Sequence, residues 1–382
     1  MKKIIRIATV GGSLKILLNG QLRFMSNYYE IIGVASNDAN LLDAAAEQEG
    51  IKTIEVDMTR RITPFKDLKA VYQLYRIIKK EKPFIVHSHT PKAGTLGMLA
   101  AKLAGIPNRL HTIAGLPLLE STGKKRMLLN SVEKFTYACA TLILPNSFGI
   151  KTIILEEGFC RATKLKILGN GSSNGIDVSH YSNDAVDKNM ATKLKEDLGI
   201  AEDDTVFIFI GRVVKDKGIN ELAEAFDAIS KINPKAKLII VGPSEDHLDP
   251  VDPATESIIT TNKNIRAVGL IKDIRPYLFI SDIFVFPSYR EGFPNVVLQS
   301  NAMGIPCIVS DINGSNEIVK HNHNGLIVPT KDVQALKDAM LELLLDPAKT
   351  EKLAMHCRDN IVKKYKREVI WKEMLKLYKS LE

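Results

Sequence analysis

Short apolar runs alternate with longer amphipathic segments along the whole chain. In the first half, the runs rich in β-branched residues are IIRIATV, EIIGVAS, KTIEVD, PFIVHS, RLHTI, TLILP and LKIL. A second series follows, with TVFIFIG, AKLIIVG, NIRAV, DIFVFPS, IPCIVS and GLIV. The runs are continuously apolar, as in parallel strands buried on both faces, and intervening segments such as 68–80 and 92–104 have helical spacing. The pattern predicts an α/β fold with two Rossmann-like, doubly wound parallel sheets.

A cluster of Gly, Ser and Asn, NGSSNGID at 170–177, lies between the two series. This composition is typical of a boundary between domains. We therefore expect one domain over residues 1–180 and a second over 181–366, with the ligand in a cleft between them. The final helix, at about 367–382, is expected to pack back on the first domain.

Length and composition restrict the class of protein. The chain has 382 residues, of which 45% are hydrophobic and 25% charged, as in an ordinary soluble protein, and this length favours two or three domains. Its first apolar run carries Lys2, Lys3 and Arg6 and ends at Val10, which is too short to span a membrane. The four cysteines are far apart and form no CxxC pair, which favours a reducing cytoplasm over a disulfide framework or a zinc site. We expect a cytoplasmic protein.

The charge differs between the two halves. Residues 1–180 hold 25 Lys and Arg against 14 Asp and Glu, whereas residues 181–382 hold 27 against 30. A basic half can meet nucleic acid, a membrane surface or a phosphorylated substrate. Nucleic acid is not expected, because no basic stripe interleaved with aromatic residues and no zinc-finger spacing is present. The segment that starts with GKKR at 123–126 and ends near Ala138 is amphipathic and favours peripheral membrane contact, narrowly, over a core-facing helix with a solvated basic start.

GRVVKDKG, at 211–218, is the first motif that carries chemistry. It follows a buried run and precedes a helical segment, so Arg212 and Lys217 are expected on a loop at the carboxyl edge of the sheet. A planar guanidinium fork and a mobile ammonium together suit a diphosphate, and they can stabilise it as a leaving group. The alternative is an ordinary solvated loop.

FPSYREGFPNVVLQ, at 286–299, is the second motif. It ends a strand, turns, and restarts as a helix at about Pro294, a residue suited to a first helical position. Glu291 precedes this helix and Gln299 lies inside it, at a separation of up to about 12 Å. The carboxylate can accept hydrogen bonds from sugar hydroxyls, and the amide can bind a ribose diol. Taken alone, Gln299 would be an exposed polar residue of a helix.

Gly11 and Gly12 follow the first apolar run. They suit a tight turn or a backbone approach to an anion equally well. The sequence is not GxGxxG, and only Glu30 lies near the position of an acidic residue that would bind a ribose. A nicotinamide cofactor is therefore not expected.

Together, GRVVKDKG and EGFPNVVLQSNAMGIPCIVSD resemble the retaining family 4 glycosyltransferases of GT-B fold over nearly the whole chain. VHSHTPKAGTLGMLAA and NGSSNGID make the chain most similar to bacterial capsule, O-antigen and glycan-assembly transferases. The resemblance implies transfer of a sugar from a nucleotide diphosphate, with retained configuration and without a catalytic metal or other cofactor. It also implies an acceptor domain first, a donor domain second, and a final helix that crosses back.

The resemblance also implies roles for individual residues. Arg212 and Lys217 match the diphosphate-binding pair, and Glu291 matches the first acid of an E-x7-E motif whose second acid is Gln299 here. The remaining donor-site positions are Gly11, Gly12, Gly211, Leu270, Phe293, Pro294, Asn295 and Val296. Ala114 replaces a frequent histidine, and the sequence does not single out either His111 or His89 as its substitute. His89, in VHSHTPKAG, is expected either to assist the acceptor hydroxyl or, with Thr90, to cap the next helix.

Three functions remain open from the sequence. The favoured one is transfer of a hexose or N-acetylhexosamine, from a UDP-sugar, to a glycan acceptor linked to a lipid diphosphate. A nucleotide-sugar epimerase would need acids and a histidine for elimination chemistry, which we cannot assemble. A non-catalytic sugar-binding protein would have no need of paired cations for a leaving group.

Overall fold

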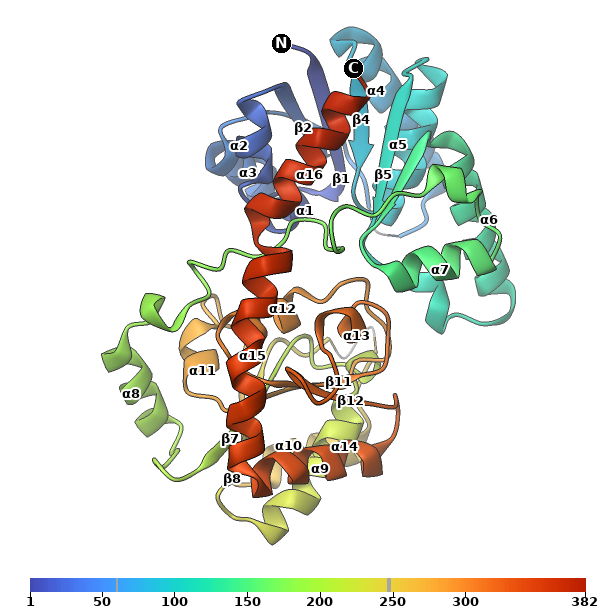
Figure 1. The fold of residues 1–382 in the computed structure, drawn as a ribbon. Helices are drawn as coiled ribbons and strands as arrows, with labels where there is room; N and C mark the ends of the chain where they lie inside the picture. Colours follow the sequence, from blue (N-terminus) through green and yellow to red (C-terminus); the bar gives the residue numbers. More distant parts are fainter. Residues whose placement is uncertain (60, 246–248) are drawn as a thin grey trace. The chain divides into compact units, whose positions relative to one another are not determined.

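The computed structural model describes residues 1–59, 61–245 and 249–382 and divides the chain into two compact units (Figure 1). The first unit comprises Met1–Gly175 and Arg367–Glu382, and the second comprises Ile176–Lys366. Each unit holds a six-stranded sheet in which all neighbouring strands are parallel. The expected α/β fold with two doubly wound sheets is confirmed.

The sheet of the first unit has the order β3-β2-β1-β4-β5-β6. Its strands are β1 (Lys3–Val10), β2 (Glu30–Ser36), β3 (Lys52–Glu55), β4 (Ile85–Ser88), β5 (Asn108–Ile113) and β6 (Leu142–Pro145). One apolar cluster joins the sheet to α4 (Pro64–Glu81), α5 (Pro91–Leu103) and α6 (Gly123–Cys139), and α7 (Phe148–Glu156) follows β6. A second cluster joins it to α1 (Gly11–Leu17), α2 (Gln21–Ser26), α3 (Leu41–Glu49) and α16 (Arg367–Ser380).

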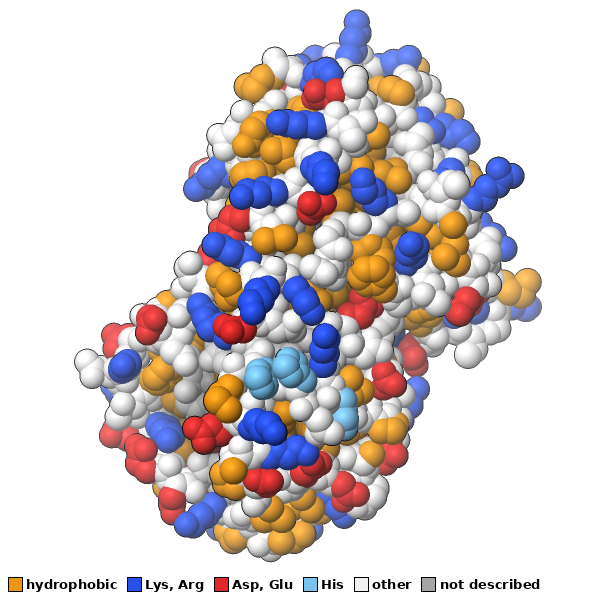
Figure 2. Space-filling model, in the orientation of Figure 1, with side chains coloured by type: hydrophobic (Ala, Val, Ile, Leu, Met, Phe, Trp, Pro, Cys, Tyr) orange, Lys and Arg blue, Asp and Glu red, His pale blue; other side chains and the backbone are white. Residues whose placement is uncertain are grey.

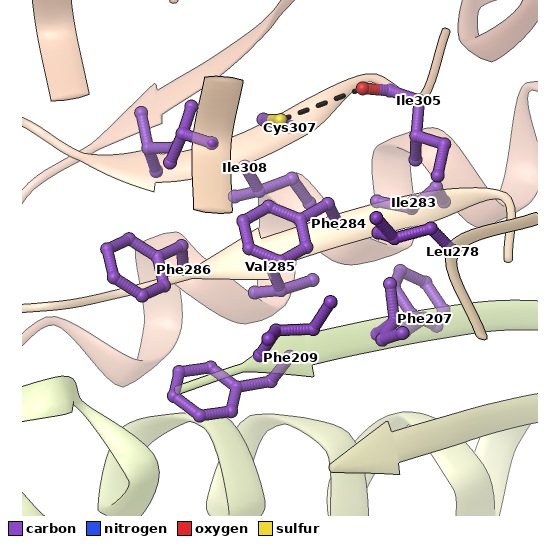
Figure 3. Close-up of a cluster of buried hydrophobic side chains, with 14 of the residues drawn as sticks. Phe207, Phe209, Leu278, Ile283, Phe284, Val285, Phe286, Ile305, Cys307 and Ile308 are labelled. Carbon is purple, nitrogen blue, oxygen red and sulfur yellow. Dashed lines mark hydrogen bonds between the residues drawn. The ribbon is translucent and has the colours of Figure 1, made fainter. Parts of the chain in front are cut away.

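The second unit has the strand order β12-β11-β10-β7-β8-β9. Its strands are β7 (Thr205–Ile210), β8 (Ala236–Val241), β9 (Ile265–Gly269), β10 (Ile283–Phe286), β11 (Cys307–Ser310) and β12 (Gly325–Val328). Its helices are α8 (Lys188–Asp197), α9 (Ile219–Ile232), α10 (Pro253–Thr261), α11 (Arg275–Phe279), α12 (Asn295–Ala302), α13 (Ser315–Ile318), α14 (Val333–Leu345) and α15 (Pro347–Tyr365). A single apolar core binds the helices to the sheet, and Figure 3 shows the phenylalanines of β7 and β10 at its centre.

One strand expected in the described part of the chain is absent. The run LKIL forms no strand: Leu165 makes one isolated bridge to Ile143, and the chain then turns at Gly169 and Gly171, which have positive φ angles. The helix expected to start at about Pro294, within the second motif, is present and begins one position after Pro294. This residue is extended, with ψ of 111°, and is the N-cap of a helix that begins at Asn295.

α16 is held on the first unit by a buried polar network as well as by apolar packing. Arg6, in β1, is fully buried and donates to His89 Nε2 at 2.8 Å and to Gln21 Oε1 at 2.6 Å. The Gln21 amide donates to Asn174, and the same Asn174 oxygen accepts a hydrogen bond from Trp371 Nε1 of α16 at 2.6 Å. The network therefore links the central strand, the 170–175 segment and the last helix.

Three histidines of the first unit are buried among these elements. Burial holds the pKa of His87 and His89 well below the usual value, with a further contribution from the nearby Arg6 charge. Burial lowers the pKa of His111 to about 4, and the ring lies directly against Gly94, where a Cβ would come within 2.3 Å of it. All three rings are therefore neutral in the folded protein at neutral pH.

These pKa values predict a loss of stability in mild acid. Between pH 7 and pH 5 the unfolded chain binds protons at histidine, with a pKa near 6.5, while the folded state does not, so the free energy of unfolding falls as the pH falls. The expected loss is about 2 kcal/mol for each of these histidines. Urea unfolding followed by fluorescence measures it, because the single tryptophan, Trp371, belongs to the first unit.

His111→Asn is the matched control for this measurement. It should reduce the loss of stability between pH 7 and pH 5 by about one third, since His87 and His89 remain, and this range lies above the usual pKa of Asp and Glu. An unfolding free energy that is the same at both pH values in the wild-type protein would contradict neutral burial of the histidines.

Candidate active site

The loop after β7 carries the first motif at the carboxyl edge of the second sheet. Gly211 continues the strand pairing through its N–H to Val241 O, and Gly242 must also be glycine, because a Cβ there would lie 1.7 Å from Gly211 O. The two strand ends therefore approach closely, and Arg212 projects from this point. Its guanidinium donates to Glu245 Oε2 at 2.7 Å and lies 4.0 Å from Asp216 Oδ1.

Arg212 is charged in this setting. Partial burial lowers its pKa, but the hydrogen bond to Glu245 and the charge of Asp216 more than offset that effect, and the pKa is raised. The side chain is still 41% exposed, so the guanidinium is accessible to a ligand. Glu245 was not identified from the sequence, since it lies outside both motifs.

The loop after β10 brings the second motif to the same edge. The Lys217 ammonium forms an ion pair with Glu291, and both side chains are mostly buried. Ser288 Oγ lies 3.0 Å from the same carboxylate, and Asn313 donates to the Glu291 backbone oxygen. Three of the expected catalytic residues, Arg212, Lys217 and Glu291, are thus on adjoining loops of one unit.

Asp216 joins these two loops. Its backbone oxygen accepts from Tyr289 N at 2.9 Å, and its carboxylate accepts from Arg290 Nη2 at 2.6 Å. Gly218 fixes the close approach, because its φ is +71° and a Cβ would lie 2.1 Å from Pro287 O. Asp216 and Arg290 were not singled out from the sequence, although both lie within the quoted motifs.

Gln299 lies half-buried in α12 and donates from Nε2 to Tyr181 OH at 2.8 Å. The Tyr181 segment is itself held by Arg358 of α15, which donates to the backbone oxygens of Tyr181 and Val178 at 2.8 Å each. The amide therefore has a fixed partner of its own. No sequence signal linked Tyr181 to Gln299, because 118 positions separate them.

The other expected donor-site residues near α12 and β9 differ in how far their side chains are exposed to solvent. Phe293 points into the core and packs on Tyr365, with ring centroids 5.3 Å apart, so its side chain does not face a ligand. Asn295 is exposed and Val296 is half-buried at the helix start. Leu270, just after β9, is 77% exposed at the same carboxyl edge of the sheet.

The expected residues of the first unit have structural roles in addition to any ligand role. Gly11 and Gly12 do not form a separate turn. They open α1, and a Cβ on Gly11 would lie 2.4 Å from Leu42 N, so this glycine permits α1 to pack against α3. Thr90 makes no capping bond to α5, so the capping alternative is wrong; its hydroxyl pairs with Thr9 instead.

His89 is buried at the end of β4, with Nε2 already accepting from Arg6. Its Nδ1 is buried and has no hydrogen-bond partner among the described residues. His111 is buried beneath Gly94 and pairs with Ser88 Oγ at 2.9 Å, so it does not replace the histidine missing at Ala114. Within residues 1–59, 61–245 and 249–382, no group of three His, Cys, Asp or Glu side chains is arranged to hold a metal ion.

Comparison with known proteins agrees with this arrangement. The family model described as glycosyl transferases group 1 matches residues 190–363, and the one described as glycosyl transferase 4-like matches residues 6–147. The capsular polysaccharide biosynthesis glycosyltransferase CapM of Staphylococcus aureus is 31% identical over 380 residues, covering 99% of this chain and 97% of its own. A UDP-Gal:α-D-GlcNAc-diphosphoundecaprenol α-1,3-galactosyltransferase of Escherichia coli is 31% identical over 373 residues, covering 94% of this chain and 92% of its own.

A third relative, from Campylobacter jejuni, is named as an N,N'-diacetylbacillosaminyl-diphospho-undecaprenol α-1,3-N-acetylgalactosaminyltransferase and is 28% identical over 343 residues, or 86% of each chain. Among solved structures, Anabaena HepE in complex with UDP superposes with a TM-score of 0.81 at 19% identity, over 99% of this chain and 100% of its own. WaaG, a glycosyltransferase of lipopolysaccharide biosynthesis, gives a TM-score of 0.75 at 12% identity, over 96% and 98% of the two chains. The chain therefore belongs to the family 4-like glycosyltransferases of GT-B fold and is a glycosyltransferase.

Proposed function

We propose that this enzyme transfers a hexose or an N-acetylhexosamine from a UDP-sugar to a lipid-diphosphate-linked glycan, with retention of configuration, in the assembly of a bacterial surface polysaccharide. The observation that carries this proposal is the cluster of Arg212, Lys217 and Glu291 at the carboxyl edge of the second sheet. Two cations on loops beside a carboxylate match the needs of a sugar diphosphate: charge neutralisation at one end and hydroxyl recognition at the other.

Donor binding follows from the same edge. The diphosphate would compete with Glu245 for Arg212 and with Glu291 for Lys217, which frees the Glu291 carboxylate to accept from sugar hydroxyls. The exposed Leu270 segment would contact the base, and Gln299 the ribose. Backbone N–H groups at Asn295 and Val296 would face the charge, and Gly11 and Gly12, at the start of α1, are proposed as further contacts of the diphosphate.

The mechanism proposed is substitution on one face of the sugar. The bond from the anomeric carbon to the diphosphate oxygen breaks while the acceptor oxygen forms a new bond on the same face. The departing oxygen takes the acceptor's proton. Arg212 and Lys217 stabilise the charge that grows on the diphosphate, so the positive charge comes from side chains and no metal ion is required. The carboxylates beside Arg212 in the described parts of the chain, Glu245 and Asp216, are each paired with an arginine, which favours direct substitution over a double displacement.

His89 fits this scheme as a positioning residue. Its Nε2 accepts from Arg6, so the ring cannot take a proton at that atom without breaking the bond. Burial also holds its pKa well below the usual value, which opposes protonation further. The acceptor's proton is therefore assigned to the diphosphate.

The acceptor is inferred from the relatives and from charge. Two of them are named for action on sugars linked to diphosphoundecaprenol. No helix in the described parts of the chain is long and apolar enough to cross a bilayer. We propose that the enzyme works at the cytoplasmic face of the membrane as a peripheral protein, with the basic start of α6 among its contacts.

The direct test is incubation with radiolabelled UDP-sugars, with and without an undecaprenyl-diphosphate-linked acceptor, in excess EDTA. Label in the lipid fraction supports the transferase. Interconversion of the free sugar would instead indicate an epimerase, and binding without turnover would indicate a sugar-binding protein.

Lys217→Ala should lower kcat by about 100-fold or more while changing the donor KM only a few-fold. The ammonium is needed most when the diphosphate leaves, and loss of one such charge contact costs several kcal/mol in the transition state. Steady-state kinetics with saturating acceptor measure this. Lys215→Ala, two residues earlier on the same loop and exposed, is the matched control; equal kcat in Lys217→Ala and the wild type would overturn the assignment.

Gln299→Leu should raise the donor KM about 5- to 10-fold with little effect on kcat, because a neutral hydrogen bond to the ribose is worth about 1 kcal/mol. Gln299→Glu should keep activity, since a carboxylate can also accept from the diol. Tyr181→Phe is the control for the internal partner of the amide. A Gln299→Leu enzyme with wild-type KM would mean that this residue only packs against Tyr181.

A further inference from the structure

α4 presents an apolar face to solvent. Phe65, Leu68 and Tyr72 are 92%, 70% and 60% exposed, and Ile62, just before the helix, is 64% exposed. The spacing of three and four residues puts the helical members on one side, opposite the buried Leu74. Isolated apolar residues at a surface are ordinary, but a continuous stripe of large ones marks an interaction site.

Basic residues border this stripe. The exposed cations of α4 are Lys66, Lys69, Arg76, Lys79 and Lys80. The two acids of the helix do not neutralise them, because Asp67 pairs with Lys92 and Glu81 pairs with Lys3 and Lys52. No ion pair found among the described residues involves any of the five cations. Figure 2 shows, on the face that it displays, how Lys and Arg side chains spread among apolar ones over the first unit.

The stripe lies near the acceptor side of its own unit. α4 follows β3 and runs back along parallel strands, so its first turns, with Phe65 and Leu68, are at the carboxyl edge of the sheet. His89 and Gly11 lie at the same edge, after β4 and β1. An arrangement that brings this edge to a membrane would bring a lipid-linked acceptor to it.

A hollow adjoins the second half of the stripe. It has a volume of about 360 Å³ and is lined by Glu55, Gln73, Arg76, Ile77 and Lys80. Two cations and an amide in its wall offer hydrogen-bond donors to a phosphate, and Glu55, which is exposed, is the one acid. The apolar half of the helix and the basic hollow are therefore arranged in succession along one helix.

We propose that the α4 face, defined as Ile62, Phe65, Leu68 and Tyr72 with the bordering cations, docks on an anionic phospholipid bilayer. Phe65 and Leu68 would enter the acyl boundary while the ammonium groups contact lipid phosphates. The location of this membrane contact differs from the one expected on α6, and its purpose rests on the proposed function, that is, on a lipid-linked acceptor.

Charge argues for a bilayer over a second copy of this chain. Self-association through the α4 face would bring two sets of five unpaired cations together, which like-charge repulsion opposes. An anionic bilayer satisfies both features, because it accepts the apolar side chains and attracts the cations. We therefore assign the α4 face to lipid. Failure to bind vesicles would point instead to a protein or nucleic-acid partner.

Vesicle co-sedimentation of the full chain tests the proposal. Vesicles of phosphatidylcholine alone and of phosphatidylcholine with 30% phosphatidylglycerol are the two probes. The wild type should bind the anionic vesicles more tightly, with a partition coefficient that falls as salt rises. Lys66→Gln/Lys69→Gln should lower that coefficient about 10- to 30-fold, and Phe65→Ser/Leu68→Ser about 10-fold or more.

Two control variants locate the site. Leu345→Ser removes an apolar side chain of similar exposure, 68%, from the second unit and should bind as the wild type does. Met127→Ser/Leu128→Ser does the same on α6 and should lower binding less than the α4 variants do. Unchanged urea midpoints would show that each variant is folded.

The outcomes separate this proposal from the proposed function. Vesicle binding requires no turnover, so the proposed membrane contact of the α4 face can be tested without an assay of sugar transfer. The proposal would be overturned if the wild-type protein bound neither type of vesicle, or if the α4 variants bound as the wild type does. It would also be overturned if only the α6 variant, Met127→Ser/Leu128→Ser, lost binding. If the proposal holds and transfer to the lipid-linked acceptor occurs, the α4 variants should lose transfer to that acceptor in vesicles but keep turnover with a short-chain, water-soluble one.

Discussion

The site depends on the pairing of two loops at the carboxyl edge of the second sheet. Asp216 accepts hydrogen bonds from Tyr289 and Arg290, and Lys217 pairs with Glu291, so each loop is held in place by the other. The glycine at 218 is what allows this, because any side chain would collide with the Pro287 carbonyl. Phe209 of β7 stacks on Phe286 of β10 in the core, and the Lys217 ammonium lies 5.7 Å from the centre of the Phe286 ring (Figure 3 shows the two phenylalanines). Arg212 and Lys217 are thus each held by an internal acid, Glu245 and Glu291 respectively.

The two units differ in the side chains that they bury at the centre of their sheets. In the second unit the central strand β7 is apolar from residue 206 to residue 210, and the buried polar pair of Asn301 and Asn324 lies beside Cys307 of β11. The first unit buries Arg6 in its central strand and satisfies it with His89 and Gln21, and through Gln21 and Asn174 with α16. Removing a buried charge partner is costly, so this network ties the last helix to the strand by more than apolar contact. Burial, followed by the charge of Arg6, holds the pKa of His89 well below the usual value, so the ring is neutral.

Strand periodicity was sufficient to predict the fold, since continuous β-branched runs such as TVFIFIG appear as buried parallel strands. The run LKIL failed because glycines at 169 and 171 turn the chain away after one bridge, and a window of four residues does not register that. The cations and Glu291 could be predicted because each lies within a compact motif. Their internal partners Glu245 and Tyr181 could not, since they come from distant segments that only the fold brings close. The lysines of α4 illustrate another limit: sequence suggests a solvated helix face, and the three-dimensional structure is needed to see that Phe65 and Leu68 are exposed among them.

The central claim is that Arg212 and Lys217 stabilise a leaving diphosphate in a transfer that retains the configuration of the donor sugar. The stereochemistry of the product tests it most directly. Proton NMR of the disaccharide formed from an α-linked UDP-sugar, recorded before any secondary hydrolysis, reports the new anomeric configuration. An α linkage is the predicted result, and a β linkage would contradict the mechanism, because it would require attack from the face opposite the diphosphate.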